Sequence, residues 1–308
     1  MIENVLKYFP VELQRQILNT KVNDNLKEIR IRAYQKVCLE YYNLEVFLEY
    51  VSTTTDILNI LLNISKNSIY AIQNDINNGF VVVPGGHRIG ICGEAVISNG
   101  RIINVKNINS MNIRISTQVF GAANKILPYV IKNSKTIRNT LIVSPPGCGK
   151  TTILRDLIRQ LSNGVENLNF KGKNIGVVDE RGEIASVYFG KSGLDLGKRT
   201  DVMSNCSKST GIDMLVRSMG LDIIATDEIG QKEDIEAILR ASLSGVGMIF
   251  TMHASSVEDV YQNKNVSCLL NDGIFECIVV LSNKNGAGTI ENIKLVKNLG
   301  KEGERDCI

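Results

Sequence analysis

Hydrophobic and polar positions in the first part of the chain follow both periods of regular secondary structure. Residues 27–32 alternate charged and apolar side chains, which predicts a half-buried strand. Residues 37–42 and 44–50 are two apolar runs on either side of an asparagine, which predicts a hairpin. Residues 56–64 repeat their apolar positions with helical spacing, and residues 10–18 predict another helix, with a proline in its first turn.

Glycine-containing turns divide the next segment into paired strands. The apolar runs 80–83 and 88–91 flank a Pro-Gly-Gly-His turn, and Asn99-Gly100 is a typical hairpin turn. Helices and strands are therefore mixed without regular alternation as far as residue 120. We expect residues 1–120 to form a small α+β domain.

The pattern changes in the second part of the chain. Short apolar runs now alternate with helical stretches, which predicts a parallel sheet with right-handed crossovers. The expected elements are residues 140–143, 150–161, 174–178, 222–226, 234–241 and 248–251. We expect residues 121–308 to form a separate α/β domain.

A glycine-rich loop joins the first of these strands to the first helix. Residues 141–152 read Leu-Ile-Val-Ser-Pro-Pro-Gly-Cys-Gly-Lys-Thr-Thr, with serine where the usual phosphate-binding loop begins with glycine. Gly147 and Gly149 let backbone N–H groups surround phosphate oxygens, Lys150 adds a charge, and Thr151 offers a hydroxyl to Mg²⁺. A plain tight turn is the alternative, but spacing and context together favour a loop that binds nucleotide phosphates. The predicted nucleotide-binding residues are Ser144, Pro145, Pro146, Gly147, Cys148, Gly149, Lys150, Thr151 and Thr152.

Acidic residues follow two of the other expected strands. Asp227 and Glu228 end a buried apolar run, where charge is costly without a partner. Asp227 is the candidate Mg²⁺ ligand, through water, and Glu228 is the candidate that activates the attacking water. Residues 179–183 carry three further acids at the same expected sheet edge, which predicts a functional role, with Glu183 as a second candidate for activating the water. Salt bridges within this loop are the alternative interpretation of the segment. Two solvated acids at a strand end are the alternative interpretation of the Asp-Glu pair.

One histidine and several arginines complete the candidate chemistry. Thr251 and His253 end another strand and would lie near the terminal phosphate, as a sensor of nucleotide state. Phosphoryl transfer also needs a cation, from this chain or a neighbouring subunit. Arg217 is the favoured catalytic arginine because it precedes the strand that leads to the Asp-Glu pair. The arginines considered are Arg88, Arg114, Arg199, Arg217 and Arg240.

Composition restricts the partners and the cellular location that are expected for the protein. The 35 basic and 32 acidic residues give a net charge of +3, which offers no chain-wide basic surface for nucleic acid. The 7 cysteines contain no C-x-x-C pair, so reduced thiols in a cytosolic protein are expected. The first residues lack a secretory signal, and no uncharged apolar run reaches the roughly 18 residues of a membrane helix. We expect a protein that is peripheral to membranes and does not span them.

Several separate motifs resemble one known family, that of stage III sporulation protein AA. They lie at residues 26–32, 79–90, 112–115, 179–185, 194–202, 227–230 and 245–254. The second half is also similar, more distantly, to type II, type IV and pilus secretion ATPases, in which the His253 and 179–183 segments correspond to a histidine box and an acidic box. Secretion ATPases often carry Gly-Glu at the Asp227-Glu228 position, where this chain is closer to the AAA+ pattern.

The resemblance implies a P-loop (RecA/AAA-like) ATPase domain that binds ATP and Mg²⁺. It also implies a homo-hexameric ring in the mother-cell cytoplasm, peripheral to the membrane. With membrane proteins of the stage III complex as partners, such a ring would power or assemble a secretion-like channel to the forespore. Two alternatives stay open from the residues alone. One is a nucleic-acid translocase or helicase on a similar core, and the other is a nucleotide-binding scaffold with little turnover.

Overall fold

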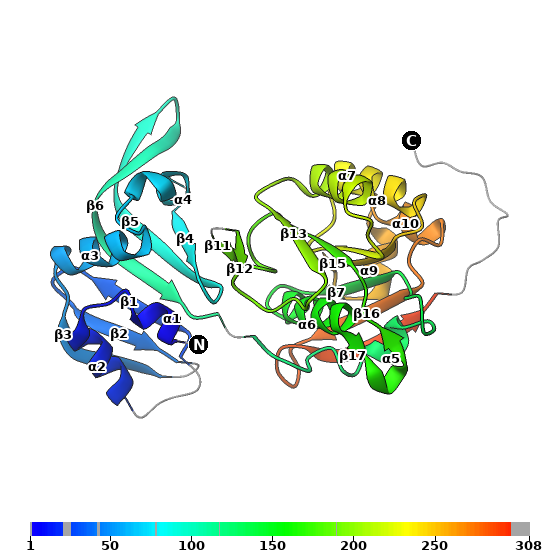
Figure 1. The fold of residues 1–308 in the computed structure, drawn as a ribbon, viewed down its shortest axis with the longest axis horizontal. Coiled ribbons are helices and arrows are strands. Elements are labelled where there is room, and N and C mark those ends of the chain that lie inside the picture. Colours follow the sequence, from blue (N-terminus) through cyan, green and yellow to red (C-terminus); the bar gives the residue numbers. More distant parts are fainter. Residues whose placement is uncertain are drawn as a thin grey trace. The chain divides into compact units, whose positions relative to one another are not determined.

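A computed structural model of the protein describes residues 2–20, 26–41, 44–77, 79–116, 118–188 and 190–296. The chain forms two compact units, seen in Figure 1. The N-terminal unit comprises Met1–Thr117 together with Ser186–Gly193, and the C-terminal unit comprises Gln118–Ala185 and Leu194–Ile308. No described helix is long enough and apolar enough to cross a membrane.

The N-terminal unit is an antiparallel sheet with helices. The strand order is β3 (Glu45–Val51), β2 (Lys36–Glu40), β1 (Glu28–Arg32), β6 (Arg101–Arg114), β5 (His87–Ser98) and β4 (Phe80–Val83). Its helices are α1 (Glu3–Leu6), α2 (Val11–Asn19), α3 (Thr54–Ile64), η1 (Ile69–Ile72) and α4 (Gln73–Asn77). The predicted hairpins are confirmed by the pairing of β2 with β3, β4 with β5, and β5 with β6.

Local sequence explains much of this unit. The β5–β6 turn uses Asn99 at φ 49° and Gly100 at φ 72°, the two left-handed residues that a tight two-residue hairpin needs. Helix α3 begins with a capping box between Thr53 and Asp56. A short hairpin from much later in the sequence joins the unit, with strands β11 (Val187–Tyr188) and β12 (Lys191–Ser192). The Tyr188 hydroxyl donates to the carbonyl of Ile64 at 2.7 Å, which anchors this hairpin to α3.

The C-terminal unit is built on a seven-stranded sheet. Its order is β13 (Thr200–Ser204), β10 (Ile175–Asp179), β14 (Ile223–Thr226), β15 (Gly247–His253), β7 (Thr140–Ser144), β16 (Cys277–Ser282) and β17 (Thr289–Leu295). All neighbours are parallel except β16 and β17. The helices are α5 (Leu127–Val130), α6 (Lys150–Asn163), α7 (Lys208–Ser218), α8 (Lys232–Ser242), α9 (Val257–Gln262) and α10 (Ser267–Asn271). A small hairpin comprises β8 (Gly164–Val165), η2 (Glu166–Leu168) and β9 (Phe170–Lys171).

The parallel order determines where polar side chains collect. Every residue of β7, β10 and β14 is buried, as expected for strands covered on both faces. Because the strands run in the same direction, the loops after β7, β10, β14 and β15 open at one carboxyl edge. The glycine-rich loop, the acidic segment, the Asp-Glu pair and the histidine therefore share that edge. The predicted α/β class with a parallel-sheet C-terminal unit is confirmed.

Candidate nucleotide site

The glycine-rich loop has the backbone of an anion-binding loop. Gly147 has φ 74°, and Gly149, with φ 86°, immediately precedes the 14-residue helix α6. Both angles lie in the left-handed region that glycine tolerates without strain. A Cβ at Gly149 would also lie 2.9 Å from the amide nitrogen of Gly288, which donates to the carbonyl of Cys148 at 2.9 Å. The β16–β17 turn therefore packs directly against the loop.

The side chain of Lys150 is buried and folds back onto the glycine-rich loop. It is 6% exposed, and its Nζ donates to the carbonyls of Ser144 at 2.9 Å and Pro145 at 3.2 Å. The Ser144 hydroxyl lies at 3.2 Å and Nδ1 of His253 at 2.9 Å from the same nitrogen. Burial lowers the pKa of Lys150, and the charge of Glu228 works against this shift. The ammonium thus sits on oxygen atoms that phosphate oxygens could replace.

His253 connects the loop to the Asp-Glu pair. An ammonium only donates, so Nδ1 accepts from Lys150 and the neutral ring carries its proton on Nε2. Nε2 lies 2.7 Å from Oε1 of Glu228 and donates to it. Three side chains, from the start of α6, the end of β15 and the turn after β14, thus form one run of hydrogen bonds. The sequence predicted that His253, at the end of its strand, lies close to the phosphates of the glycine-rich loop. In the sheet, β15 pairs with β7, and His253 lies opposite Ser144 of that loop.

Glu228 occupies a strained position. Its φ is 41°, which costs a non-glycine residue about 1–3 kcal/mol and is typical of functional sites. Its amide donates to the hydroxyl of Thr251 at 3.0 Å, and the amide of Ile229 donates to the carbonyl of Thr251 at 2.9 Å. Thr251 is fully buried. Because its hydroxyl accepts from the amide of Glu228, it supports the turn that carries Glu228.

Asp227 is the buried acid of the pair, only 3% exposed. Burial raises the pKa of Asp227 to about 6, the ammonium of Lys208 opposes that rise, and the charges of Asp179, Glu183 and Glu228 add to it. A buried carboxylate under such conditions is suited to a cation. In the described part of the chain, no three His, Cys, Asp or Glu side chains are grouped as a metal site. The residues fit Mg²⁺ that is bound mainly through phosphate oxygens and water.

Thr151 and Thr152 are the second and third residues of α6 and are partly buried. The predicted metal-side hydroxyl of Thr151 therefore lies in the first turn of the helix that begins at Lys150. The carboxylate end of β14 lies two strands from β7, with β15 between them. At a spacing of about 4.8 Å per strand, the ends of β14 and β7 lie about 10 Å apart in the sheet, and a hydrated ion with phosphates can bridge such a distance.

The acidic segment after β10 is a tightly fastened turn. The carboxylate of Asp179 accepts from the amides of Glu183 at 2.8 Å, Ile184 at 3.1 Å and Ala185 at 2.8 Å. Buried Arg155 of α6 donates to the carbonyls of Ile184 at 2.9 Å and Glu183 at 2.7 Å. Asp179 therefore organises the turn, while the side chain of Glu183 is exposed.

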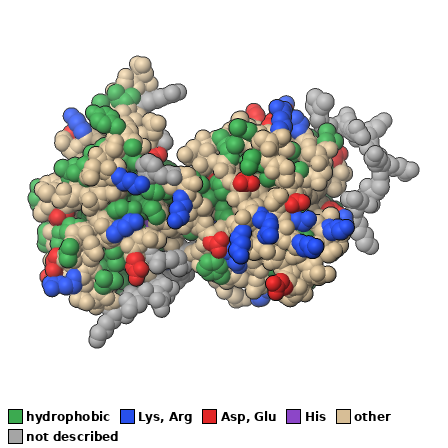
Figure 2. Space-filling model, viewed as in Figure 1, with side chains coloured by type: hydrophobic (Ala, Val, Ile, Leu, Met, Phe, Trp, Pro, Cys, Tyr) green, Lys and Arg blue, Asp and Glu red, His purple; other side chains and the backbone are tan. Residues whose placement is uncertain are grey.

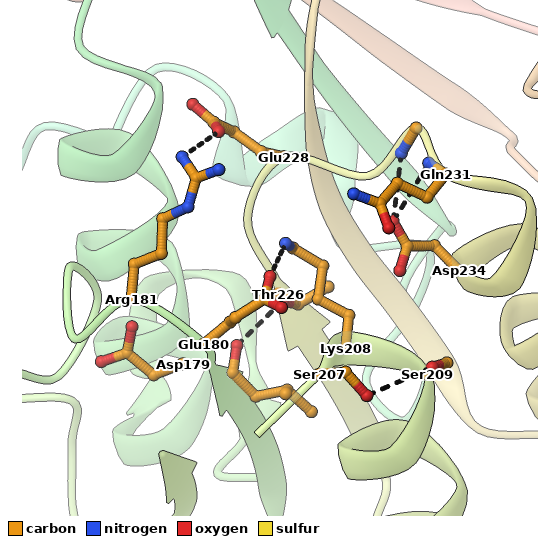
Figure 3. Close-up of polar contacts among 12 residues, drawn as sticks. Asp179, Glu180, Arg181, Ser207, Lys208, Ser209, Thr226, Glu228, Gln231 and Asp234 are labelled. Atoms are coloured by element: carbon orange, nitrogen blue, oxygen red, sulfur yellow. Dashed lines mark hydrogen bonds and ion pairs between the residues drawn. The ribbon is translucent and has the colours of Figure 1, made fainter. Parts of the chain in front are cut away.

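Two cations at this edge were not predicted from the sequence (Figure 3). Lys208 opens α7 with a side chain only 7% exposed and forms an ion pair with Glu180. Arg181 donates from its guanidinium to Oε2 of Glu228 at 3.1 Å. A lysine at a helix N-terminus is opposed by the helix dipole, so helix-forming preferences gave no reason to expect Lys208 there. The signal that could have found both is their place after strands β13 and β10 of the same sheet.

Three of the five predicted arginines belong to the C-terminal unit and lie away from the candidate site. Arg217 is in the last turn of α7, a helix that returns to the amino edge of the sheet, opposite the glycine-rich loop. Arg240 pairs with Asp213 at 2.8 Å, and Arg199 donates to the carbonyl of Ser162 at 2.9 Å. The structure does not bring these three to the candidate site. The N-terminal unit holds the other two, Arg88 and Arg114.

Solved structures share this fold. The pilus retraction motor PilT with bound ADP has a TM-score of 0.57 at 16% identity, over 87% of this chain and 76% of that chain. The ATPase DotB of Legionella pneumophila has a TM-score of 0.54 at 15% identity, over 88% of this chain and 76% of that chain. At these identities the likeness concerns the fold, which is that of secretion and pilus P-loop ATPases.

Sequence comparison identifies the family. The chain is 38% identical to the Stage III sporulation protein AA of Bacillus subtilis (strain 168) over 268 residues, 87% of this chain and 86% of that protein. It is 27% identical to the ycf45 protein of Cyanidium caldarium over 174 residues, 54% of this chain and 47% of that protein. The sequence model described as "Sporulation stage III, protein AA" matches residues 2–300. The protein therefore belongs to the sporulation stage III protein AA family.

Proposed function

We propose that the protein is a Mg²⁺-dependent ATPase whose active site is the carboxyl edge of the C-terminal sheet. The observation that carries this proposal is the continuous run from Lys150 through His253 to Glu228, at 2.9 Å and 2.7 Å. It links the glycine-rich loop, through one imidazole, to the carboxylate that we propose as the base for water. Phosphoryl transfer depends on this kind of positioning and charge stabilisation.

Each group has a role in this proposal. The loop amides and Lys150 hold the β- and γ-phosphates of ATP. Thr151 and Asp227 hold Mg²⁺, which neutralises phosphate charge when bound. His253 responds to the terminal phosphate through Lys150. The ammonium of Lys150 is the hydrogen-bond partner of Nδ1, and a bound phosphate would draw that ammonium away.

Glu228 is the better candidate for activating the water than Glu183. The Glu228 carboxylate is one imidazole away from the ammonium of Lys150. Glu183 comes from the turn after β10, which is separated from the glycine-rich loop by β14 and β15. Its backbone, through Arg155 and Asp179, has a clear part in fastening that turn. We therefore assign the water-activating role to Glu228.

We further propose a homo-hexameric ring that works at the cytoplasmic side of a membrane complex in the mother cell. The sporulation name of the Bacillus subtilis relative and the fold shared with a pilus retraction motor support a motor that powers or assembles a secretion-like channel. Its membrane partners would be the other stage III proteins. Basic and acidic side chains are interspersed on the face shown in Figure 2, which gives no support to a nucleic-acid track.

Nucleotide binding and hydrolysis test the assignment together. The wild-type protein is expected to bind ATP in a calorimeter and to hydrolyse it only with Mg²⁺. Lys150→Ala should lose both, and Glu228→Gln should bind ATP but turn over at least about 100-fold more slowly. Lys171→Gln changes an exposed charge on β9 and serves as the charge-matched control, with unchanged turnover. Undiminished turnover in Lys150→Ala would refute the proposed function.

A further inference from the structure

One arginine of the C-terminal unit lies at the proposed catalytic carboxylate, and it is none of the five expected from the sequence. The guanidinium of Arg181 donates to Oε2 of Glu228 at 3.1 Å (Figure 3). The two residues come from the ends of the adjacent parallel strands β10 and β14. The Arg181 side chain is 61% exposed, so water or a ligand can reach it.

The contact leaves Glu228 with both carboxylate oxygens engaged. Oε1 accepts from His253 at 2.7 Å and Oε2 accepts from Arg181 at 3.1 Å. Hydrogen bonds to a carboxylate are strong because the acceptor carries a charge, so both partners hold the Glu228 side chain in place. Arg181 thus occupies the Glu228 oxygen that His253 leaves open, and its departure would make room there for a water.

The backbone of the turn that carries Arg181 is held by hydrogen bonds and an ion pair, whereas the Arg181 side chain is mostly exposed. The preceding residue, Glu180, is paired with buried Lys208 of α7. The residue before that, Asp179, accepts three backbone amides of the same turn. A fixed backbone with an exposed guanidinium allows the side chain to exchange one anionic partner for another without movement of the turn.

Three other described cations near this edge are already engaged. Lys150 belongs to the loop, and Lys208 is buried against Glu180. Arg155 is buried and donates to two backbone carbonyls. Among the described residues of the C-terminal unit, Arg181 is thus the arginine at the catalytic carboxylate that is exposed and held by a single exchangeable ion pair.

We propose that Arg181 is a catalytic arginine supplied by the same chain, which leaves Glu228 for the terminal phosphate of a bound triphosphate. The exchange provides a cation to the transferred group and frees Oε2 of Glu228 to take a proton from water. Because a diphosphate lacks the terminal group, it does not draw Arg181 away and the base stays paired. This inference rests on the proposed ATPase function and adds the means by which the site distinguishes ATP from its product.

Binding of two nucleotides to Arg181→Gln tests this inference. Calorimetry with Mg²⁺ and either a non-hydrolysable ATP analogue or ADP measures the two affinities separately. The variant should bind the triphosphate analogue about 10- to 100-fold more weakly than wild type, the effect of one lost charge-assisted hydrogen bond, with ADP affinity unchanged. Its kcat should fall by about 100-fold or more. Arg181→Lys should regain part of the triphosphate affinity because it keeps the charge.

Other results would overturn it. Equal losses for the triphosphate and for ADP would mean that Arg181 only supports the turn. Unchanged affinity for both would mean that it never contacts phosphate. Lys150→Ala separates a failure of the Arg181 inference from a failure of the proposed ATPase function, because it should weaken the binding of both nucleotides in any P-loop ATPase. If wild type and Lys150→Ala bind nucleotide equally, the proposed function itself fails, whatever Arg181→Gln does. Lys171→Gln again controls for the loss of one positive charge.

Discussion

Replacement of Asp227 by asparagine is expected to stabilise the nucleotide-free protein while it abolishes Mg²⁺-dependent hydrolysis. In the folded protein the pKa of Asp227 is raised from 3.8 to about 6, first of all by burial. Between these two values the folded state holds a proton that the unfolded chain releases. Stability therefore falls as pH rises through this window, and the full cost is present above about pH 6. A pKa difference of about 2 corresponds to about 3 kcal/mol at pH 8.

Denaturant titration of wild type and Asp227→Asn at two pH values measures this cost. The variant should be more stable by up to about 3 kcal/mol at pH 8, without nucleotide or metal. At about pH 4 the carboxyl group is largely protonated in the folded protein, so the gain should shrink to under about 1 kcal/mol. Asp201→Asn, at an exposed position of β13 in the same unit, is the matched control and should show no such gain. An Asp227→Asn variant that is less stable at pH 8, or equally stabilised at both pH values, would refute the reasoning.

Three further substitutions test the supports of the site. Thr251→Val removes the hydroxyl that accepts from the amide of Glu228, so it should cost about 1–3 kcal/mol in denaturant titration and lower kcat more than it changes KM; a normal kcat would contradict this. Gly149→Ala places a Cβ 2.9 Å from backbone of the β16–β17 turn at φ 86°, so calorimetry should show no nucleotide binding; wild-type affinity would show that the turn adapts freely. Lys208→Met removes the cation that lowers the pKa of Asp227, so the acidic limb of the ATPase pH profile should move to higher pH, and a move to lower pH would contradict the effect assigned to the Lys208 charge.

The sequence predicted the glycine-rich loop because its signal is local. The loop needs glycine at left-handed positions and a helix that starts with Lys150, and all of these fall within a few residues. The strands that carry the other groups were predictable for a related reason. Buried parallel strands such as β10 and β14 are mainly apolar runs, and acidic residues stand at the end of β10 and directly after β14. Their shared edge then follows from parallel order alone.

The rest depends on contacts between distant segments. Strand β13, an edge strand reading Thr-Asp-Val-Met-Ser, lacks an apolar run and was not predicted. Helix α7 was missed with it, and Lys208 with the helix. Arg217 precedes the β14 strand in sequence, but a helix that crosses back to the amino edge carries it away from the site. The role of Arg181 could not be predicted, because this residue lies within a run of acids and its partner, Glu228, is 47 residues away in the sequence. Nothing in the hydropathy pattern marks the excursion Ser186–Gly193 into the N-terminal unit.

A crystal structure with Mg²⁺ and a non-hydrolysable ATP analogue tests the central claim most directly. We predict that the ammonium of Lys150 leaves Nδ1 of His253 for the phosphates, that the metal lies between the hydroxyl of Thr151 and a water held by Asp227, and that Glu228 faces a water in line with the terminal phosphate. A nucleotide bound away from the glycine-rich loop, or a metal held by other carboxylates, would contradict the account.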